Sequence, residues 1–140
     1  MHGGYVTLPA QSVPVILHRC YTRGMWEIEG TDEFTAWYMA LDALDTVRVD
    51  AAVERLAEAG PALGRPLVDT LKTSRHPQMK ELRPTASLRI LFAFDPRRTA
   101  ILLLGGDKRG QWSEWYQPMV PPADALYDEH LKTLHEEGLL

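Results

Sequence analysis

The 140-residue chain contains a single cysteine, Cys20, and no long hydrophobic run. One cysteine cannot form an internal disulfide, and it excludes a zinc site built from several cysteines. The longest apolar segments, such as residues 100–104, are far shorter than the roughly 20 residues that a membrane-spanning helix needs. These absences favour a protein of the reducing cytoplasm that has no membrane-spanning segment.

The chain also has fewer basic than acidic residues, 15 against 19, which gives a formal net charge of −4. The basic residues are unevenly distributed, because residues 71–110 hold nine of them and only three acids. A positive region inside an acidic protein indicates a binding site for a polyanion. RNA or another phosphate ligand is therefore the first expectation.

The length and a hydrophobic content of 45% fit one domain with one core. Residues 1–24 contain no acid, whereas residues 25–70 contain ten acids and three cations, and Met25 stands directly before the first periodic segment. We therefore expect residues 1–24 to be an N-terminal extension, either loosely ordered or the product of an upstream translation start. Residues 25–140 are expected to form the folded domain.

Hydrophobic periodicity and turn residues predict seven elements in the order β-α-α-β-β-β-α. The expected helices are a segment capped by Thr31 and reaching Leu41, residues 45–59, and a last helix that begins after Pro121 and Pro122. The expected strands are residues 26–30, 79–83, 87–94 and 99–104, with a loop over 60–73 and a tight turn at 95–98. The predicted class is α+β: a two-helix hairpin packed on a mainly antiparallel four-stranded sheet, followed by a C-terminal helix.

The strand predicted at residues 88–94 alternates between two faces. One face carries bulky residues and is expected to meet the helix hairpin, while the other carries Leu91 and Ala93 together with Arg89. An unpaired charge in such an apolar strand is costly, so Arg89 either forms a structural salt bridge or serves a site on that face. The face that carries Arg89 is the candidate site.

The sequence GGDKRG at residues 105–110 suggests a phosphate-binding loop at first sight. A P-loop would need Lys and then Ser or Thr after Gly110, where this chain has Gln111 and Trp112, so the nucleotide-binding interpretation fails. The segment is instead interpreted as a flexible exit from a strand, presenting Lys108 and Arg109.

Three aromatic residues follow this segment, Trp112, Trp115 and Tyr116. Cations beside aromatic rings suit single-stranded RNA, whose bases stack and whose phosphates pair with the cations, although Trp115 and Tyr116 can equally belong to the core. Arg97 and Arg98, at the predicted turn, are more typical of solvent-exposed residues but can also touch phosphates. The histidines are scattered and do not predict a metal site.

Three sequence segments together resemble a known family: KELR at 80–83, LRILFAFDPRR at 88–98, and LLLGGDKRGQWSEWY at 102–116, followed by a helix. They are similar to the RelE/HigB toxins of type II toxin-antitoxin systems, and more narrowly to the phage-derived HigB-like branch. The similarity extends from Trp26, through LGRP at 63–66, to His135. The resemblance implies a RelE-like fold and a cytoplasmic, ribosome-dependent endoribonuclease that cuts messenger RNA and inhibits translation. It also implies a cognate helix-turn-helix antitoxin, through which alone the toxin would reach operator DNA.

The resemblance further implies a set of site residues. In the family the ribose 2′-hydroxyl attacks the adjacent phosphate, and neither a metal nor another cofactor is needed. By position, Arg89 corresponds to the strand arginine at the scissile phosphate and Tyr116 to the C-terminal tyrosine that orients the nucleophile. The implied catalytic residues are Arg89, Lys80, Arg83, Lys108 and Tyr116. The implied RNA-binding residues are Arg109, Trp112, Trp115, Arg97 and Arg98.

Two other functions remain as alternatives at this point. The related ParE toxins share the architecture but act on DNA gyrase without RNase residues. A degenerate phage-derived toxin that only binds its partner would fit the acidic surface of the first two predicted helices. The cations Lys80, Arg83, Arg89 and Lys108, taken together, favour the RNase.

Overall fold

The computed structural model describes residues 25–140, so the predicted N-terminal extension at 1–24 lies outside the described residues. The described chain forms one five-stranded sheet, three α-helices and two short 3-10 helices. In chain order the elements are β1 (Glu27–Gly30), α1 (Asp32–Met39), α2 (Ala43–Ala59), η2 (Gly60–Ala62), β2 (Val68–Thr70), β3 (Lys80–Leu82), β4 (Leu88–Phe94), β5 (Thr99–Asp107), η3 (Trp112–Trp115) and α3 (Tyr116–Glu136). None of the described helices is long and apolar enough to cross a membrane.

The sheet has the strand order β1-β5-β4-β3-β2. All neighbouring strands are antiparallel except β1, which runs parallel to β5. The predicted α+β class and mainly antiparallel sheet are confirmed, but the predicted number of four strands is wrong. The missed strand, β2, has three residues within a segment rich in glycine and proline, so its sequence predicts a loop and only its pairing with β3 makes it a strand.

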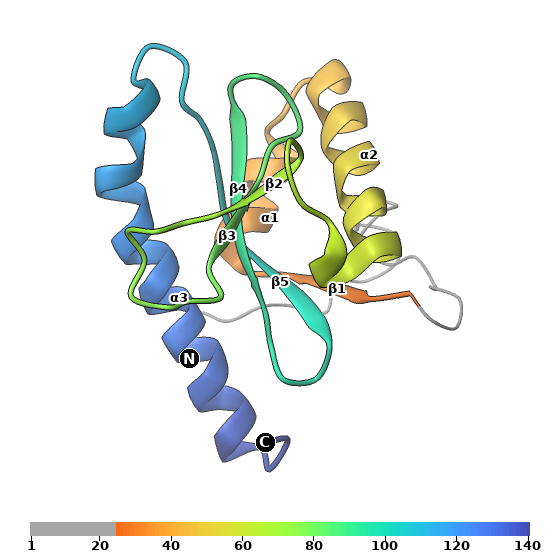
Figure 1. Ribbon diagram of the computed structural model, residues 1–140, viewed down its shortest axis with the longest axis vertical. Coiled ribbons are helices and arrows are strands. Elements are labelled where there is room, and N and C mark those ends of the chain that lie inside the picture. Colours follow the sequence, from red (N-terminus) through yellow and green to blue (C-terminus); the bar gives the residue numbers. More distant parts are fainter. Residues whose placement is uncertain (1–24) are drawn as a thin grey trace.

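The helices cover both faces of the sheet, with α2 and α3 on opposite sides (Figure 1). One core joins Phe34 of α1 and Leu56 of α2 to Ile90 and Phe92 of β4. A second core joins Leu91 and Ala93 of β4 to Val120 and Ala123 of α3, together with residues of β5. The alternation predicted along β4 is therefore confirmed, and Arg89 lies on the face covered by α3.

The first two helices begin where the sequence places capping residues. The Thr31 hydroxyl accepts a hydrogen bond from the Phe34 amide at 3.0 Å, and the Asp42 carboxylate accepts one from the Asp45 amide at 2.8 Å. The second helix ends at Ala59 and is capped by Gly60, whose φ of 59° is a value that glycine adopts without strain. These local signals fix the helices that cover the face opposite Arg89.

Strand β5 is longer than predicted, because Gly105 and Gly106 belong to it rather than to a flexible exit. A Cβ on Gly105 would approach the ring of Trp37 to 2.1 Å, and a Cβ on Gly106 would approach the ring of Trp115 to 2.7 Å. The two glycines therefore let two indole rings pack closely against the strand. The strand continues to Asp107, so Lys108 follows directly at its end.

The last helix begins at Tyr116, seven residues earlier than predicted, and Pro121 and Pro122 lie inside it. Proline inside a helix removes backbone hydrogen bonds, and for that reason the sequence predicted a helix start at this point. Here 3-10 helix η3 leads directly into α3, and the buried side chains of Val120 and Ala123 anchor the proline-containing turn to the second core. The early start brings Tyr116 to the end of the sheet where Arg89 lies.

Candidate active site

A group of charged and aromatic side chains surrounds the carboxylate of Glu81 on the α3 side of the sheet. The Tyr116 hydroxyl donates to Glu81 Oε1 at 2.7 Å, and Arg83 Nη2 donates to Oε2 at 2.8 Å. Arg89 Nε lies 3.6 Å from Oε1, and Lys108 Nζ donates to the Tyr116 hydroxyl at 3.1 Å. We refer to these five residues, Glu81, Arg83, Arg89, Lys108 and Tyr116, as the Glu81 cluster.

Four separate segments supply this cluster, and the strand register brings them together. Glu81 of β3 is paired with Leu91 of β4, so it shares a face with Arg89, two residues away along β4. The backbone amide of Lys108 donates to the Ser87 carbonyl at 2.9 Å, which fixes Lys108 beside the start of β4. Tyr116 completes the cluster as the first residue of α3.

Arg89 is held firmly, since its side chain is only 8% exposed. Its Nη1 donates to the carbonyl oxygens of Thr85 at 3.0 Å and Leu88 at 2.8 Å. Its Nε is buried and has no hydrogen-bond partner among the described residues. Arg89 therefore provides a fixed positive charge at the floor of the cluster, and it also takes part in the structural ion pair that the sequence left open.

The electrostatic environment changes how readily the cluster exchanges protons. Burial lowers the pKa of Lys108, and the nearby charge of Arg89 lowers it further. Burial and the hydrogen bond to Glu81 raise the pKa of Tyr116. At neutral pH Tyr116 is therefore a hydroxyl donor, while Lys108 gives up its proton more easily than an ordinary lysine. The Lys108 ammonium also lies 4.9 Å from the centroid of the Tyr116 ring and 5.4 Å from that of Trp112.

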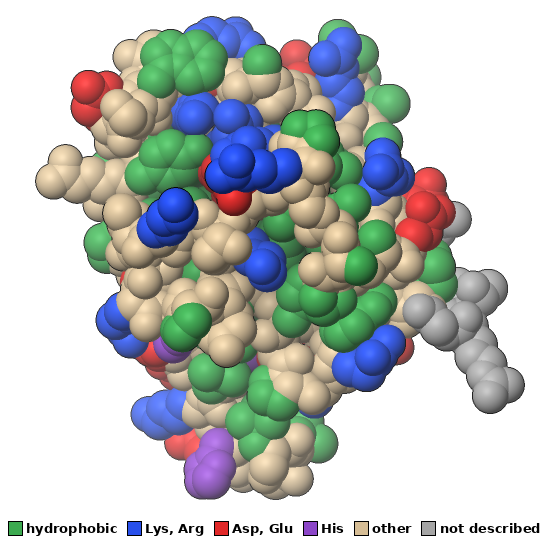
Figure 2. All heavy atoms as spheres, in the orientation of Figure 1, with side chains coloured by type: hydrophobic (Ala, Val, Ile, Leu, Met, Phe, Trp, Pro, Cys, Tyr) green, Lys and Arg blue, Asp and Glu red, His purple; other side chains and the backbone are tan. Residues whose placement is uncertain are grey.

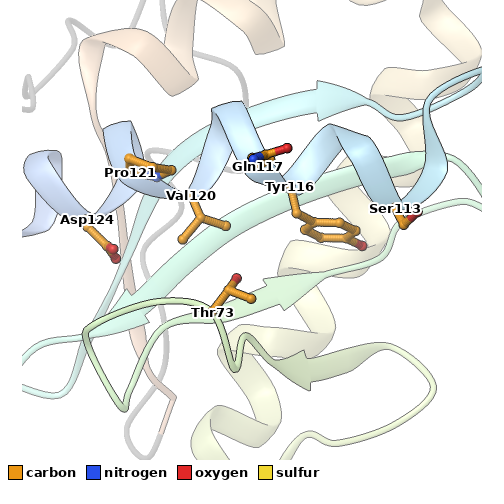
Figure 3. A pocket seen from close by; sticks show the side chains of 7 residues that line it. All are labelled: Thr73, Ser113, Tyr116, Gln117, Val120, Pro121 and Asp124. Atoms are coloured by element: carbon orange, nitrogen blue, oxygen red, sulfur yellow. The ribbon is translucent and has the colours of Figure 1, made fainter.

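The cluster borders a pocket of about 310 Å³ between the start of α3 and the segment before β3. Tyr116 is shared by the cluster and the pocket, and Figure 3 shows Tyr116, Val120 and Asp124 projecting from one side of α3 towards Thr73. Figure 2 shows Lys and Arg side chains gathered over the upper part of the molecule, around an acidic side chain. The site thus combines a positive surface with a neighbouring hollow.

Residues 36–128 match the family of phage-derived Gp49-like proteins. The chain belongs to this family. It is 50% identical over 104 residues to the putative toxin HigB2 of Mycobacterium tuberculosis, and 48% identical over 103 residues to the putative toxin HigB3 of the same organism. The match covers 71% of this chain and 52% of the first relative, and 73% of this chain and 90% of the second. The sequence-based resemblance to the phage-derived, HigB-like branch of the toxins is confirmed.

The fold is also similar to one chain in the crystal structure of the toxin-antitoxin complex RelBE2 from Mycobacterium tuberculosis. The alignment covers 59% of this chain and 98% of that chain, with 17% sequence identity and a TM-score of 0.41. The family assignment rests on the sequence matches.

In this Gp49-like chain, the structure brings together four of the five predicted catalytic residues. The exception is Lys80, which is paired with Phe92 and therefore lies on the opposite face from Glu81. Lys80 lines a separate pocket of about 250 Å³, beside the segment between η2 and β2. The family resemblance groups Lys80 with Arg83 in one site. Side chains of a strand alternate between its two faces, so Glu81 and not Lys80 shares a face with Arg83.

The predicted RNA-binding residues are divided among three places. Arg109 is near the cluster, with Nη2 3.4 Å from the Ser87 hydroxyl, and Trp112 is 53% exposed beside Lys108. Trp115 is only 4% exposed and belongs to the second core, so the structure favours its alternative interpretation as a core residue. Arg97 and Arg98 lie at the other end of β4, in the turn that leads to β5.

Both turn arginines have partners of their own at that end. Arg97 Nη2 lies 2.7 Å from Asp95 Oδ2 and 3.1 Å from Glu29 Oε1. The guanidinium of Arg98 lies over the Trp26 ring, 4.0 Å from its centroid. The structure therefore does not bring Arg97 and Arg98 to the Glu81 cluster.

Sequence reasoning missed Glu81, the residue at the centre of the site. In the sequence it is only one of the three acids within the basic region at residues 71–110. A usable signal was present, since Glu81 precedes Arg83 by two residues in the same predicted strand and therefore shares its face. The exact cross-strand register that brings Glu81 to Arg89 was not available from the sequence.

Proposed function

We propose that this protein is the toxin of a toxin-antitoxin system and acts as an endoribonuclease on messenger RNA at the ribosome. The observation that carries the proposal is the hydrogen-bonded series Lys108–Tyr116–Glu81, flanked by Arg83 and Arg89. It supplies a proton donor, a proton acceptor and fixed cations in one place. Those are the groups that cleavage of RNA by its own 2′-hydroxyl requires.

The cations serve the phosphate at which the reaction occurs. Arg89 is fixed by backbone carbonyls and Arg83 by Glu81, so neither has to reorganise when negative charge develops on the phosphorane. Lys108 is near enough to the Tyr116 hydroxyl to share a hydrogen bond, and its lowered pKa suits it to donate a proton. We assign Lys108 as the donor to the leaving 5′-oxygen.

The carboxylate of Glu81 serves as the proton acceptor, either directly or through the Tyr116 hydroxyl that donates to it. In the reaction the 2′-oxygen forms a bond to phosphorus, and its proton passes to Glu81. The bond from phosphorus to the 5′-oxygen breaks, and that oxygen takes a proton from Lys108. The products are a 2′,3′-cyclic phosphate and a 5′-hydroxyl end, with every proton accounted for.

A cognate antitoxin is the proposed partner that holds the toxin inactive. The family assignment supports this, because both curated relatives carry the name of a putative toxin. We expect the antitoxin to be a helix-turn-helix protein and to mediate any contact with operator DNA. Ribosome and messenger RNA complete the set of proposed partners.

The decisive test is the Glu81→Gln variant, which keeps the size of the side chain but removes its ability to accept a proton. In a reconstituted translation system we expect the rate of messenger RNA cleavage to fall by a factor of about 100 or more, the range typical of a lost general base. Glu114→Gln, which removes a nearby exposed acid outside the cluster, should cleave at the wild-type rate. Thermal unfolding of both variants checks that they fold.

The end groups of the cut RNA provide a second criterion. A 2′,3′-cyclic phosphate with a 5′-hydroxyl supports the proposal, and a 5′-phosphate contradicts the mechanism. Full cleavage by Glu81→Gln would contradict the role of this residue. Growth inhibition by a wild-type protein that cuts no RNA would favour a target such as gyrase.

A further inference from the structure

The turn between β3 and β4, residues 83–87, is organised around one hydroxyl group. Thr85 Oγ1 accepts hydrogen bonds from the backbone amides of Leu88 at 3.0 Å and Ser87 at 3.3 Å. A threonine hydroxyl that binds amides two and three residues further along the chain closes a turn in this way. The two bonds fix the backbone of three residues: Thr85 itself, Ser87 and Leu88.

The carbonyls of the same three residues hold two cations of the candidate active site. Arg89 Nη1 donates to the Thr85 carbonyl at 3.0 Å and to the Leu88 carbonyl at 2.8 Å. The backbone amide of Lys108 donates to the Ser87 carbonyl at 2.9 Å. Each carbonyl that holds a cation therefore belongs to a residue whose backbone the Thr85 hydroxyl fixes.

The orientation of the Arg89 guanidinium depends on these carbonyls. The side chain is 8% exposed, and its Nε lies 3.6 Å from Glu81 Oε1. A guanidinium is planar and rigid, so a rotation of the two carbonyls that bind Nη1 also turns Nε away from Glu81. Cations stabilise a phosphorane most when they are aligned before its negative charge develops. The geometry of the turn therefore bears on the rate of the reaction.

We infer that Thr85 is a positioning residue, whose hydroxyl shapes the turn between β3 and β4 so that Arg89 and Lys108 face the same phosphate. The inference rests on the proposed function and adds a residue that acts through the two cations and not on the RNA itself. A threonine that only stabilised the turn would change the free energy of unfolding. A positioning residue also changes the rate of cleavage in a protein that remains folded.

The test is Thr85→Val, which keeps nearly the same shape but removes the acceptor of the Ser87 and Leu88 amides. We expect the rate of messenger RNA cleavage at saturating RNA to fall about tenfold, since a misplacement of about 1 Å costs up to about 100-fold. The RNA concentration needed for half-maximal cleavage should change much less, because the aligned cations act mainly on charge that develops in the transition state. Primer extension in a reconstituted translation system measures both quantities.

Two further variants serve as controls. Thr85→Ser keeps the hydroxyl and should cleave at the wild-type rate. Thr35→Val makes the same substitution in α1, where the threonine hydroxyl has no hydrogen-bond partner among the described residues, and it should also cleave at the wild-type rate. Urea unfolding checks that each variant folds. If Thr85→Val does not fold, Thr85→Ser carries the test, because slow cleavage by this variant contradicts a role of the hydroxyl.

A spectroscopic measurement tests the position of Arg89 without cleavage. Nuclear magnetic resonance of the complete chain follows the Nε–H signal of Arg89, which reports the surroundings of the guanidinium. We expect this signal to shift in Thr85→Val and to remain unchanged in Thr85→Ser and Thr35→Val.

The outcomes distinguish the inference from the proposed function. Full cleavage by a folded Thr85→Val, equal loss in Thr85→Ser, or slow cleavage with an unchanged Arg89 signal overturns the inference even if the wild type cuts RNA. A wild type that cuts no RNA overturns the endoribonuclease, and the Arg89 signal then decides the position alone. A shift in Thr85→Val that Thr85→Ser does not show supports the positioning role, and an unchanged signal overturns it.

Discussion

The strand pair β4–β5 carries a charged cluster at each end, the Glu81 cluster at one and a cluster around Asp95 at the other. Asp95 accepts hydrogen bonds from the Arg97 amide at 2.8 Å, from Arg97 Nη2 at 2.7 Å and from the Thr99 amide at 3.3 Å, and its Oδ2 lies 2.7 Å from His130 Nε2. Its side chain is 0% exposed. We refer to Asp95, Arg97, His130 and Glu29 as the Asp95 cluster.

The two clusters differ in the balance between acids and cations. In the Asp95 cluster two carboxylates form ion pairs with one arginine, Arg97, so the positive charge of this arginine is already balanced. In the Glu81 cluster two arginines, Arg83 and Arg89, pair with one central carboxylate, and a third cation, Lys108, is joined to it through the Tyr116 hydroxyl. The further acid nearby, Asp69, contacts only Arg83 among these three cations. A network whose acids satisfy its cations stabilises a turn, whereas a surplus of fixed cations leaves room for a phosphate.

The largest effect that would test this comparison is expected from Asp95→Asn. The change leaves the partly buried Arg97 and the buried His130 without their central acid, and breaking such a pair costs about 3 to 5 kcal/mol of unfolding free energy. Urea unfolding measures the loss. Asp107→Asn removes a more exposed carboxylate, 3.8 Å from Arg109, and should cost less than about 0.5 kcal/mol. Equal losses in the two variants would show that the Asp95 cluster is not a structural anchor.

A somewhat smaller effect, on activity rather than stability, is expected from Lys108→Ala. Loss of this donor should slow RNA cleavage about a hundredfold. The unfolding free energy should stay nearly constant, because within residues 25–140 the hydrogen-bond partner of the Lys108 ammonium is the neutral Tyr116 hydroxyl and no acid forms an ion pair with it. Lys80→Ala, on the opposite face of the sheet, is the matched control and should change the rate by less than about threefold. Rates are measured by primer extension on a defined messenger RNA. If Lys80→Ala slows cleavage more than Lys108→Ala does, the reaction takes place on the face of the sheet that carries Lys80.

A change of about tenfold is expected from Trp112→Ala, which removes an exposed ring beside Lys108. Stacking of one base on an aromatic side chain is worth about 1 to 3 kcal/mol, so the loss should be visible in the RNA concentration needed for half-maximal cleavage. Leu44→Ala removes an equally exposed apolar side chain on α2 and should have no effect. An unchanged concentration dependence in Trp112→Ala would remove this tryptophan from the RNA surface.

The smallest effect is expected in mild acid. Burial opposes the ionisation of Asp95, but hydrogen bonds from His130 and Arg97 outweigh it and lower the pKa of this carboxyl below its ordinary value of 3.8. The resulting stabilisation is present above the unfolded-state pKa and is lost as pH falls through the lowered, folded-state pKa. Between pH 5 and 3.5 the wild type should therefore lose less than about 1 kcal/mol more stability than Asp95→Asn. If the unfolding free energies of the wild type and Asp95→Asn change equally with pH, the pKa of Asp95 does not differ between the folded and unfolded states.

The sequence predicted the elements whose signals are local. The Thr31 cap, the alternation along β4 and the turn at residues 95–98 all depend on neighbouring residues, and the structure contains them. The predictions were wrong where contacts between distant segments determine the secondary structure. Strand β2 is a strand only because it pairs with β3, and the turn of α3 that contains Pro121 is helical although proline disfavours it. Tertiary contacts overrode local propensity at both places.

The residues of the candidate site also divide into those that the sequence predicts and those that depend on contacts between distant segments. Arg89 was found because an arginine is unusual in an apolar strand, and Arg83, Lys108 and Tyr116 entered through the family resemblance. Charge along the chain groups Lys80 with Arg83, whereas the two-residue period of the strand puts Glu81 on the face of Arg89 and Lys80 on the opposite face. The pocket beside Tyr116 depends on the approach of Thr73 to α3, two segments more than 40 residues apart, which no local pattern specifies.

The parallel pairing of β1 with β5 has a consequence for synthesis of the chain. Glu27 is paired with Thr99 and Gly30 with Leu102, so the first strand finds its neighbour only after roughly 70 further residues have been made. At about 5 to 20 residues per second, the nascent chain carries an unpaired β1 for several seconds. The strand that β1 requires, β5, ends at Asp107, and Lys108 and Tyr116 of the Glu81 cluster follow it in the chain. A nascent chain therefore cannot carry a complete site before nearly all of its domain has left the ribosome.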